Sequence, residues 1–255
     1  MAEDNKKGLL KANPYYIITL IFFRGINWSK ISKNLLESNF LNGKRVRALV
    51  DLRVTGYDRA LFELLSMNVE LGTSVQERLA KAVSTLSQGS PVPEDWWAMD
   101  TCIDQGRDRV VKRCFEIMSL QQLRDKDLRW ILGCQRIAQE LERIADYACD
   151  LAELSKLKPV QDWPVEILQM GQNLLVMFDG ALSMLAAETE NSVDLNLQDD
   201  ALDQVYAALR QELVGGAAQR NTELGIALVT ARTLERMGDH VVNVGKALAG
   251  IKQST

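Results

Sequence analysis

The segments LERIADYACD (residues 141–150) and LERMGDHVVN (residues 234–243) carry one pattern at two places in the chain, 93 positions apart. Each begins with Leu-Glu-Arg and places an aspartate four residues after the glutamate, so that Asp146 follows Glu142 and Asp239 follows Glu235. A spacing of four residues puts two side chains on the same face of an α-helix. We therefore interpret the two segments as equivalent helices of an internally duplicated helical protein.

The chain around these segments has the pattern of an all-α fold. From Tyr57 onward the apolar residues recur at spacings of three and four, and glycine and proline gather in a few clusters such as QGSPVP (88–93) and GGAAQRN (215–221). Pro159 and Pro164 separate two halves with the same plan. The sequence predicts two tandem three-helix bundles, residues 57–158 and 159–255, related by internal duplication. The expected helices span residues 58–87, 93–119, 125–157, 165–190, 194–213 and 222–249, with Asp125 capping the third and Asp194 starting the fifth.

Residues 1–56 form a basic N-terminal extension to this plan. Residues 1–55 hold ten Lys and Arg against four Asp and Glu, whereas the remaining residues hold twenty against thirty. The apolar run YYIITLIFF (15–23) is far shorter than the roughly 20 residues that a membrane-spanning helix needs. We interpret the extension as an appendage or an over-long translated start, with a peripheral basic anchor as the functional alternative.

The acidic charge of the body and its few cysteines narrow the classes of function. An acidic surface disfavours nucleic acid as the main ligand and favours metal cations or basic surfaces of partner proteins. The four cysteines have no CxxC spacing, and the chain is too large to need disulfides, so we interpret them as core residues of a protein in the reducing cytoplasm. No GxxxxGK[ST] nucleotide-binding loop is present in the sequence.

Both copies of the motif place their acids beside a buried apolar stripe. With 100° per residue, Ile137, Leu141 and Ile144 lie on the stripe of the first copy, and Glu142 and Asp146 fall on a ridge next to it. The second copy repeats this geometry, so we expect two acidic ridges that face outward. Like charges four residues apart cost an isolated helix about 0.2–0.5 kcal/mol, which suggests that a binding partner offsets the repulsion.

The preceding helix of each half offers a second pair of acids at the same height. Helices joined by a short turn bring residues equidistant from the turn side by side, and the turns near residues 123 and 219 place Asp104 beside Glu142 and Asp203 beside Glu235. Convergent carboxylates suit hard cations such as Mg²⁺, Mn²⁺ or iron. The candidate metal ligands are Asp100, Asp104, Glu142, Asp146, Asp199, Asp203, Glu235 and Asp239.

Simpler interpretations compete with a metal site. Arg143 and Arg236 each precede an aspartate by three residues and are placed to pair with it, and Asp199 lies where it would complement a helix dipole. His240 is the only histidine, and because Tyr147 occupies its counterpart position we favour a packed or surface role over ligation. We expect Gly238 and Gly245 to permit close helix approach.

The same residues resemble the PhoU family of phosphate-transport regulatory proteins. The resemblance is carried by LERIADYACDLAE (141–153), LERMGDHVVNVGKAL (234–248), DTCID (100–104), DDALD (199–203) and DKDLR (125–129). It implies two three-helix bundles, a homodimer, and multinuclear iron or zinc clusters on the eight carboxylates named above. The chain departs from the family pattern at Asp150, where asparagine is usual, and at Cys102, where an acid is frequent.

The resemblance also implies a function. Members act as cytoplasmic adaptors that couple the ATPase subunit of the high-affinity phosphate ABC transporter to a phosphate-sensing histidine kinase, and they restrain the phosphate regulon when phosphate is plentiful. We thus expect a non-enzymatic regulator that binds metal ions (iron, zinc, manganese or magnesium) and reaches the membrane only through partners. The alternatives are a metal-free helical adaptor and a carboxylate-bridged di-iron enzyme. The latter is disfavoured because the Glu-x-x-His spacing of such enzymes is missing.

Overall fold

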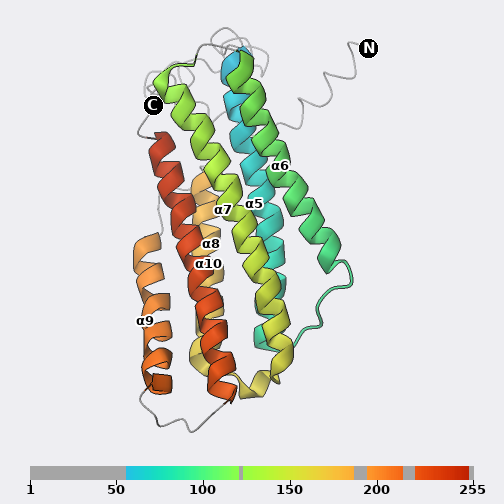
Figure 1. Cartoon of the computed structure of the whole chain (residues 1–255), viewed down its shortest axis with the longest axis vertical. Helices are drawn as coiled ribbons and strands as arrows, with labels where there is room; N and C mark the ends of the chain where they lie inside the picture. Colours follow the sequence, from blue (N-terminus) through green and yellow to red (C-terminus); the bar gives the residue numbers. More distant parts are fainter. Residues whose placement is uncertain (1–55, 121–122, 187–193, 215–221, 253–255) are drawn as a thin grey trace, which may run out of the picture.

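The protein is helical throughout the part of the chain that can be described. The computed structural model describes residues 56–120, 123–186, 194–214 and 222–252, and the predicted extension 1–56 lies outside these ranges except for Gly56. The all-α fold of two three-helix units is confirmed (Figure 1). No helix in the described ranges has the length and hydropathy needed to cross a bilayer. The helices are α5 (Gly56–Gln88), α6 (Trp96–Leu120), α7 (Asp125–Leu154), α8 (Val165–Ala186), α9 (Leu195–Val214) and α10 (Thr222–Lys252).

The described helix ends lie within three residues of their expected positions: α6 begins at Trp96 instead of 93, and α7 ends at Leu154 instead of 157. The expected end of the fourth helix, at 190, lies outside the described residues. Asp194 starts α9 as predicted, because its Oδ1 accepts hydrogen bonds from the backbone N–H groups of Asn196 (3.1 Å) and Leu197 (3.2 Å). The prediction that Asp125 caps the third helix is wrong. The N-cap position falls one residue earlier, at Arg124, so Asp125 lies in the first turn and pairs with Arg129 at 3.1 Å.

The break between the halves is built from two short 3-10 turns. These are η2 (Ser155–Leu157) and η3 (Val160–Asp162), and α8 begins directly after Pro164. The proline limits the conformations of its neighbours, and its carbonyl oxygen accepts the first backbone hydrogen bond of α8, from Ile167 at 3.1 Å. The chain therefore changes direction here and starts the second unit.

The six helices pack as two units that share one interior. α7 and α10 lie side by side along the middle of the molecule, and α5 packs against α8 on the other side of the core (Figure 1). α6 lies on the outside of α5 and α7, and α9 lies on the outside of α8 and α10. Each unit thus has a long central helix (α7 or α10), a second core helix (α5 or α8) and an outer helix that carries acids (α6 or α9).

The predicted apolar stripes form the centre of this interior. Every residue of both stripes is buried, and one continuous apolar cluster draws on all six helices. Met170 and Met177 of α8 are also fully buried, which agrees with a packing role. The buried stripe residues are Ile137, Leu141, Ile144, Ala148 and Leu151 of α7 and Ala227, Ala231, Leu234, Val241 and Leu248 of α10.

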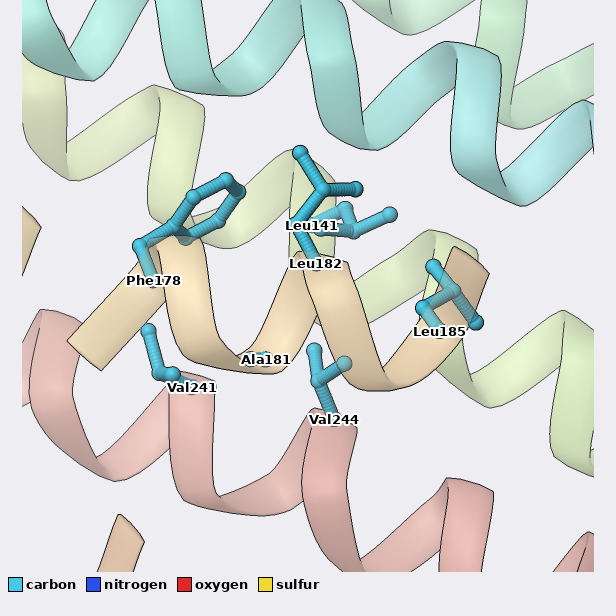
Figure 2. Close-up of a pocket in the computed structure, with 7 residues that line it drawn as sticks. All are labelled: Leu141, Phe178, Ala181, Leu182, Leu185, Val241 and Val244. Atoms are coloured by element: carbon cyan, nitrogen blue, oxygen red, sulfur yellow. The ribbon is translucent and has the colours of Figure 1, made fainter. Parts of the chain in front are cut away.

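A small apolar cavity marks the place where the two units meet. Figure 2 shows its lining: Leu141 of α7 faces Val241 and Val244 of α10, and four residues of α8 close the remaining side. All seven lining residues are apolar, so the cavity offers a ligand no hydrogen-bonding group. We interpret it as a packing gap between helices and not as a binding site.

The cysteines only partly follow the expectation. All four are free thiols, and Cys114 and Cys134 are buried in the core, as expected. Cys102 is exposed and Cys149 is half-buried. The reason for the difference is that Cys102 lies between Asp100 and Asp104, on the outer side of α6, whereas the stripe of α6 contains Ile103.

Candidate metal-binding ridges

The hairpin α6–α7 brings the acids of the first half together in the expected register. Its turn is centred near Leu123, as predicted, and Arg107 joins the two helices: its Nη2 lies 3.7 Å from Asp104 Oδ1, and its Nη1 donates to Glu142 Oε1 at 3.1 Å. We call Asp100, Asp104, Glu142 and Asp146 the first ridge.

The carboxylates of the first ridge act on one another electrostatically. Burial raises the pKa of Asp146, and the nearby charges of Asp100 and Asp104 raise it further. Burial likewise raises the pKa of Glu142, with Asp146 adding to the effect and Arg107 opposing it. These directions show that acids from both helices share one local field.

A buried arginine, which sequence reasoning missed, enters the first ridge from α5. Arg78 is fully buried, and its Nη2 lies 3.2 Å from Asp100 Oδ1. Its Nη1 donates to the carbonyl oxygen of Trp96 at 3.1 Å, and its guanidinium lies 4.5 Å from the centre of the Trp96 ring. Nη2 also donates to Cys149 Sγ on α7. The signal was present in the sequence, because Arg78 occupies a stripe position between Val75 and Leu79, both of them buried.

The second ridge consists of Asp199 and Asp203 of α9 together with Glu235 and Asp239 of α10. Its turn near residue 219 lies outside the described residues, but the electrostatics show that the four acids are close together. Burial raises the pKa of Asp199 to about 6, and Asp239, Asp203 and Glu235 all push it in the same direction, while Lys246 opposes them. Burial also raises the pKa of Glu235.

Two carboxylate oxygens of the second ridge are buried without a hydrogen-bond partner among the described residues. They are Asp199 Oδ1 and Glu235 Oε2. Glu235 is only 7% exposed, and its other oxygen, Oε1, accepts a hydrogen bond from Arg232. The expectation that the ridges face outward is therefore wrong for Glu235. A helical wheel of α10 alone cannot show that the outer helix, α9, covers this part of α10.

Close packing of α9 on α10 explains that burial. A Cβ atom placed on Gly238 would lie 2.8 Å from Asp199 Oδ1 and 2.7 Å from Leu202 Cδ1, and one on Gly245 would lie 2.6 Å from Leu195 Cδ1. The predicted role of both glycines in close helix approach is confirmed. Gly238 thus provides the space in which the carboxylate of Asp199 lies.

His240 does not belong to the second ridge. Its Nδ1 lies 2.7 Å from Glu140 Oε2 on α7, and its ring stacks on Tyr147 with 5.6 Å between ring centres. Asn243 donates to the same Glu140 oxygen at 3.3 Å. The histidine is packed, as we favoured, and it links the two units. Sequence reasoning missed Glu140 because it considered pairs of helices within one unit, whereas Glu140 contacts His240 of the other unit.

The ridges differ in how their charges are balanced. In the second ridge, Arg232 pairs with Glu235, and Asp239 makes a long ion pair, with 3.9 Å between its Oδ2 and Arg236 Nη1. Within the described ranges, no three His, Cys, Asp or Glu side chains are arranged as a group that would hold a metal ion. Carboxylate oxygens remain the donor type that hard divalent cations prefer.

Comparison with known proteins shows what this duplicated arrangement is similar to. The PhoU domain model matches residues 69–155 and 167–248, one match in each helical unit. A phosphate-specific transport system accessory protein PhoU homolog of Streptococcus pneumoniae is 28% identical over 200 residues, covering 75% of this chain and 93% of the relative. The corresponding homolog of Synechocystis is 28% identical over 220 residues, covering 80% and 96%.

Solved structures share the fold. The crystal structure of PhoU from Pseudomonas aeruginosa superposes with a TM-score of 0.66 at 23% identity, covering 78% of this chain and all of that one. PhoU from Streptococcus pneumoniae gives a TM-score of 0.64 at 23% identity, covering 78% and 98%. With a PhoU domain matched to each of its two three-helix units, the chain belongs to the PhoU family.

Proposed function

We propose that the protein is an accessory regulator of phosphate uptake and phosphate-starvation signalling. The observation that carries this proposal is the match of a PhoU domain to each helical unit, since the relatives that span most of the chain are named as accessory proteins of the phosphate-specific transport system. The described helices offer an acidic, fully helical scaffold, which suits docking to other proteins. We propose no catalytic activity.

The proposed partners are the ATPase subunit of a phosphate ABC transporter and a phosphate-sensing histidine kinase. In this proposal the protein is a cytoplasmic homodimer that reaches the membrane only through these partners and restrains the phosphate regulon when phosphate is plentiful. The acidic body, with thirty Asp and Glu against twenty Lys and Arg after residue 55, supports docking on basic partner surfaces.

We also propose that the second ridge binds a hard metal ion. No three side chains of the described residues are already gathered as a metal-holding group, but the donor chemistry suits a hard cation. Glu235 Oε2 and Asp199 Oδ1 are buried carboxylate oxygens without a partner among the described residues, and burying such groups unpaired is costly. A bound cation would neutralise the mutual repulsion of Asp199, Asp203, Glu235 and Asp239. The ion itself (iron, zinc, manganese or magnesium) would supply positive charge that ties α9 to α10.

The regulatory role is tested by deleting the gene from its source organism. A phosphate-starvation reporter measured in high phosphate should switch on in the deletion strain and return to silence when the wild-type gene is restored. A reporter that stays silent in the deletion strain contradicts the proposal. Complementation with Glu235→Gln then separates a metal-dependent regulator from a metal-free helical adaptor, because the adaptor keeps its function without that carboxylate.

The proposed partners are tested by co-purification. Tagged full-length protein should retain the transporter ATPase and the kinase when both are expressed with it, and size-exclusion chromatography of the purified protein should give the mass of a dimer. A tagged, unrelated helical protein of similar acidity serves as the control for charge-driven retention. Equal recovery of the partners on both baits would argue against specific docking.

A further inference from the structure

The first ridge contains a cation of its own. Arg78 approaches Asp100 from α5, and Arg107 joins Asp104 to Glu142. We infer that the two ridges, although duplicated in sequence, differ in function: Arg78 and Arg107 close the first ridge as an internal ion-pair network that holds no metal ion, and metal binding is confined to the second ridge. This inference deepens the proposed function. Only its statement on metal binding at the second ridge rests on that proposed function.

Arg78 is held in place from several sides and cannot easily make way for a metal ion. Its side chain is fully buried, stacks on the Trp96 ring and donates to the Trp96 carbonyl oxygen. A metal ion bound to Asp100 would lie close to the guanidinium, since Asp100 Oδ1 is only 3.2 Å from Arg78 Nη2. Two positive charges at such a distance inside the protein repel one another strongly. Moving Arg78 instead would leave a buried guanidinium without its carboxylate.

The other acids of the first ridge either lie next to an arginine or are exposed to solvent. Glu142 accepts a hydrogen bond from Arg107 at 3.1 Å, and the same guanidinium lies 3.7 Å from Asp104. Asp146 is exposed to solvent on the outer side of α7. Three of the four carboxylates of this ridge, Asp100, Asp104 and Glu142, thus already have an arginine within 4 Å. The donor set does not fit a metal ion in the way that the second ridge does.

The second ridge has no counterpart of Arg78. The helix that corresponds to α5 is α8, whose sequence VEILQMGQNLLVMFDGALSMLA contains neither lysine nor arginine. Its nearest arginines, Arg232 and Arg236, come from α10 itself and pair with Glu235 Oε1 and with the half-exposed Asp239. Glu235 Oε2 and Asp199 Oδ1 stay unpaired among the described residues. The difference between the ridges therefore originates in two arginines of the first unit, Arg78 on the core helix α5 and Arg107 on the outer helix α6.

The duplication supplies matched variants for a direct test. Metal-free full-length protein is titrated with Mn²⁺ and the bound metal per chain is measured by equilibrium dialysis and elemental analysis. We compare wild type, the pair Glu142→Gln with Asp146→Asn, and the equivalent pair Glu235→Gln with Asp239→Asn. The second-ridge pair should lose the bound Mn²⁺, and the first-ridge pair should bind as much as wild type. A lower Mn²⁺ stoichiometry in the first-ridge pair would overturn the inference.

Urea unfolding in the presence of a chelator tests, without any metal, whether Arg78 and Arg107 close the first ridge as an ion-pair network. Asp100→Asn should lower the urea midpoint of unfolding, because it takes the carboxylate away from a buried arginine. Asp199→Asn, at the equivalent position, should raise the midpoint, because it relieves repulsion. Shifts of the same sign would overturn the inference. If wild type binds no Mn²⁺ but the midpoints shift in opposite directions, the metal-binding proposal fails and the arginine-closed first ridge stands.

Discussion

The carboxyl group of Asp199 makes the stability of the metal-free protein depend on pH. Its pKa is raised to about 6 from 3.8, so between these values the folded state binds more protons than the unfolded state. Stability therefore falls as pH rises through this window. We expect the free energy of unfolding in chelator to increase by about 1 kcal/mol from pH 7.5 to pH 5, well below the full shift because solvent screens a partly exposed group.

The measurement is urea unfolding at both pH values for wild type and Asp199→Asn. The variant has no carboxyl group at this position, so it should gain less stability on acidification than wild type. Asp200→Asn, which removes an exposed carboxylate one position along the same helix, is the matched control and should follow wild type. Equal pH dependence of Asp199→Asn and wild type would show that the pKa of Asp199 is not raised in the folded protein.

At the scale of residues, the sequence was informative where a single helix decides the outcome. The apolar stripes and the proximity of Asp104 to Glu142 followed from spacing alone, because periodicity and turn position are properties of one helix or one hairpin. The burial of Glu235 depends on how closely α9 packs on α10, and the entry of Arg78 into the first ridge depends on a third helix, α5. No spacing rule within the motif contains that information.

At the scale of elements, the contact between α9 and α10 depends on Gly238. Replacing glycine by alanine inside a helix normally stabilises it by up to about 1 kcal/mol. At Gly238, however, the added methyl group would lie 2.8 Å from Asp199 Oδ1 and 2.7 Å from Leu202 Cδ1, so both side chains must move, and Leu202 is buried and has little room to do so. We expect Gly238→Ala to destabilise the protein by about 1–3 kcal/mol, measured by urea unfolding.

Gly225 provides a control for Gly238 on the same helix. A Cβ atom placed there meets nothing within 4 Å among the described residues, so Gly225→Ala should keep the helical gain and raise the free energy of unfolding. If Gly238→Ala behaves like Gly225→Ala, then α9 does not pack on α10 as closely as described, and the proposed second ridge loses its geometric basis.

Helix boundaries were predicted well because their signals are local. Proline and glycine clusters ended α5 and separated the units, and α9 begins within one residue of the expected start at Asp194, whose side chain caps it. The error at Asp125 is a shift of one position, which arose because an aspartate is favourable both as an N-cap and in the first turn. Sequence patterns distinguish those two roles poorly.

At the scale of the whole molecule, His240 and Glu140 link the two units across α10 and α7. The side chain of Glu140 is only 13% exposed, and replacing His240 by alanine removes its 2.7 Å partner while Arg136 and Asn243 remain nearby. We expect His240→Ala to lower the free energy of unfolding by roughly 1 kcal/mol, because a mostly buried carboxylate loses one of its hydrogen bonds.

A double-mutant cycle isolates this link from unrelated packing effects. Urea unfolding of His240→Ala, Glu140→Gln and the double variant should show that the two single effects do not add, with a coupling of about 0.5–1 kcal/mol. Additive effects would mean that the two side chains do not interact in solution, and the connection between the units would then depend on apolar contacts alone.

The two units are not expected to fold as independent domains. The most extensive contact between any two described helices runs across the units, between α7 and α10, and α5 packs against α8 in the same interior. Separating residues 57–158 from residues 159–255 would expose the faces of all four core helices to water. We therefore expect each fragment alone to show little cooperative unfolding, and an equimolar mixture to regain the helical circular dichroism and the sharp urea transition of the intact chain.

The alternative outcome, two fragments that each unfold cooperatively, would show that the duplicated units are autonomous and that the shared interior contributes little to their stability. We expect the first outcome because both core helices of each unit are apolar on the side that faces the other unit. A unit alone would leave this large, continuous apolar face uncovered, and soluble monomers rarely tolerate such a face.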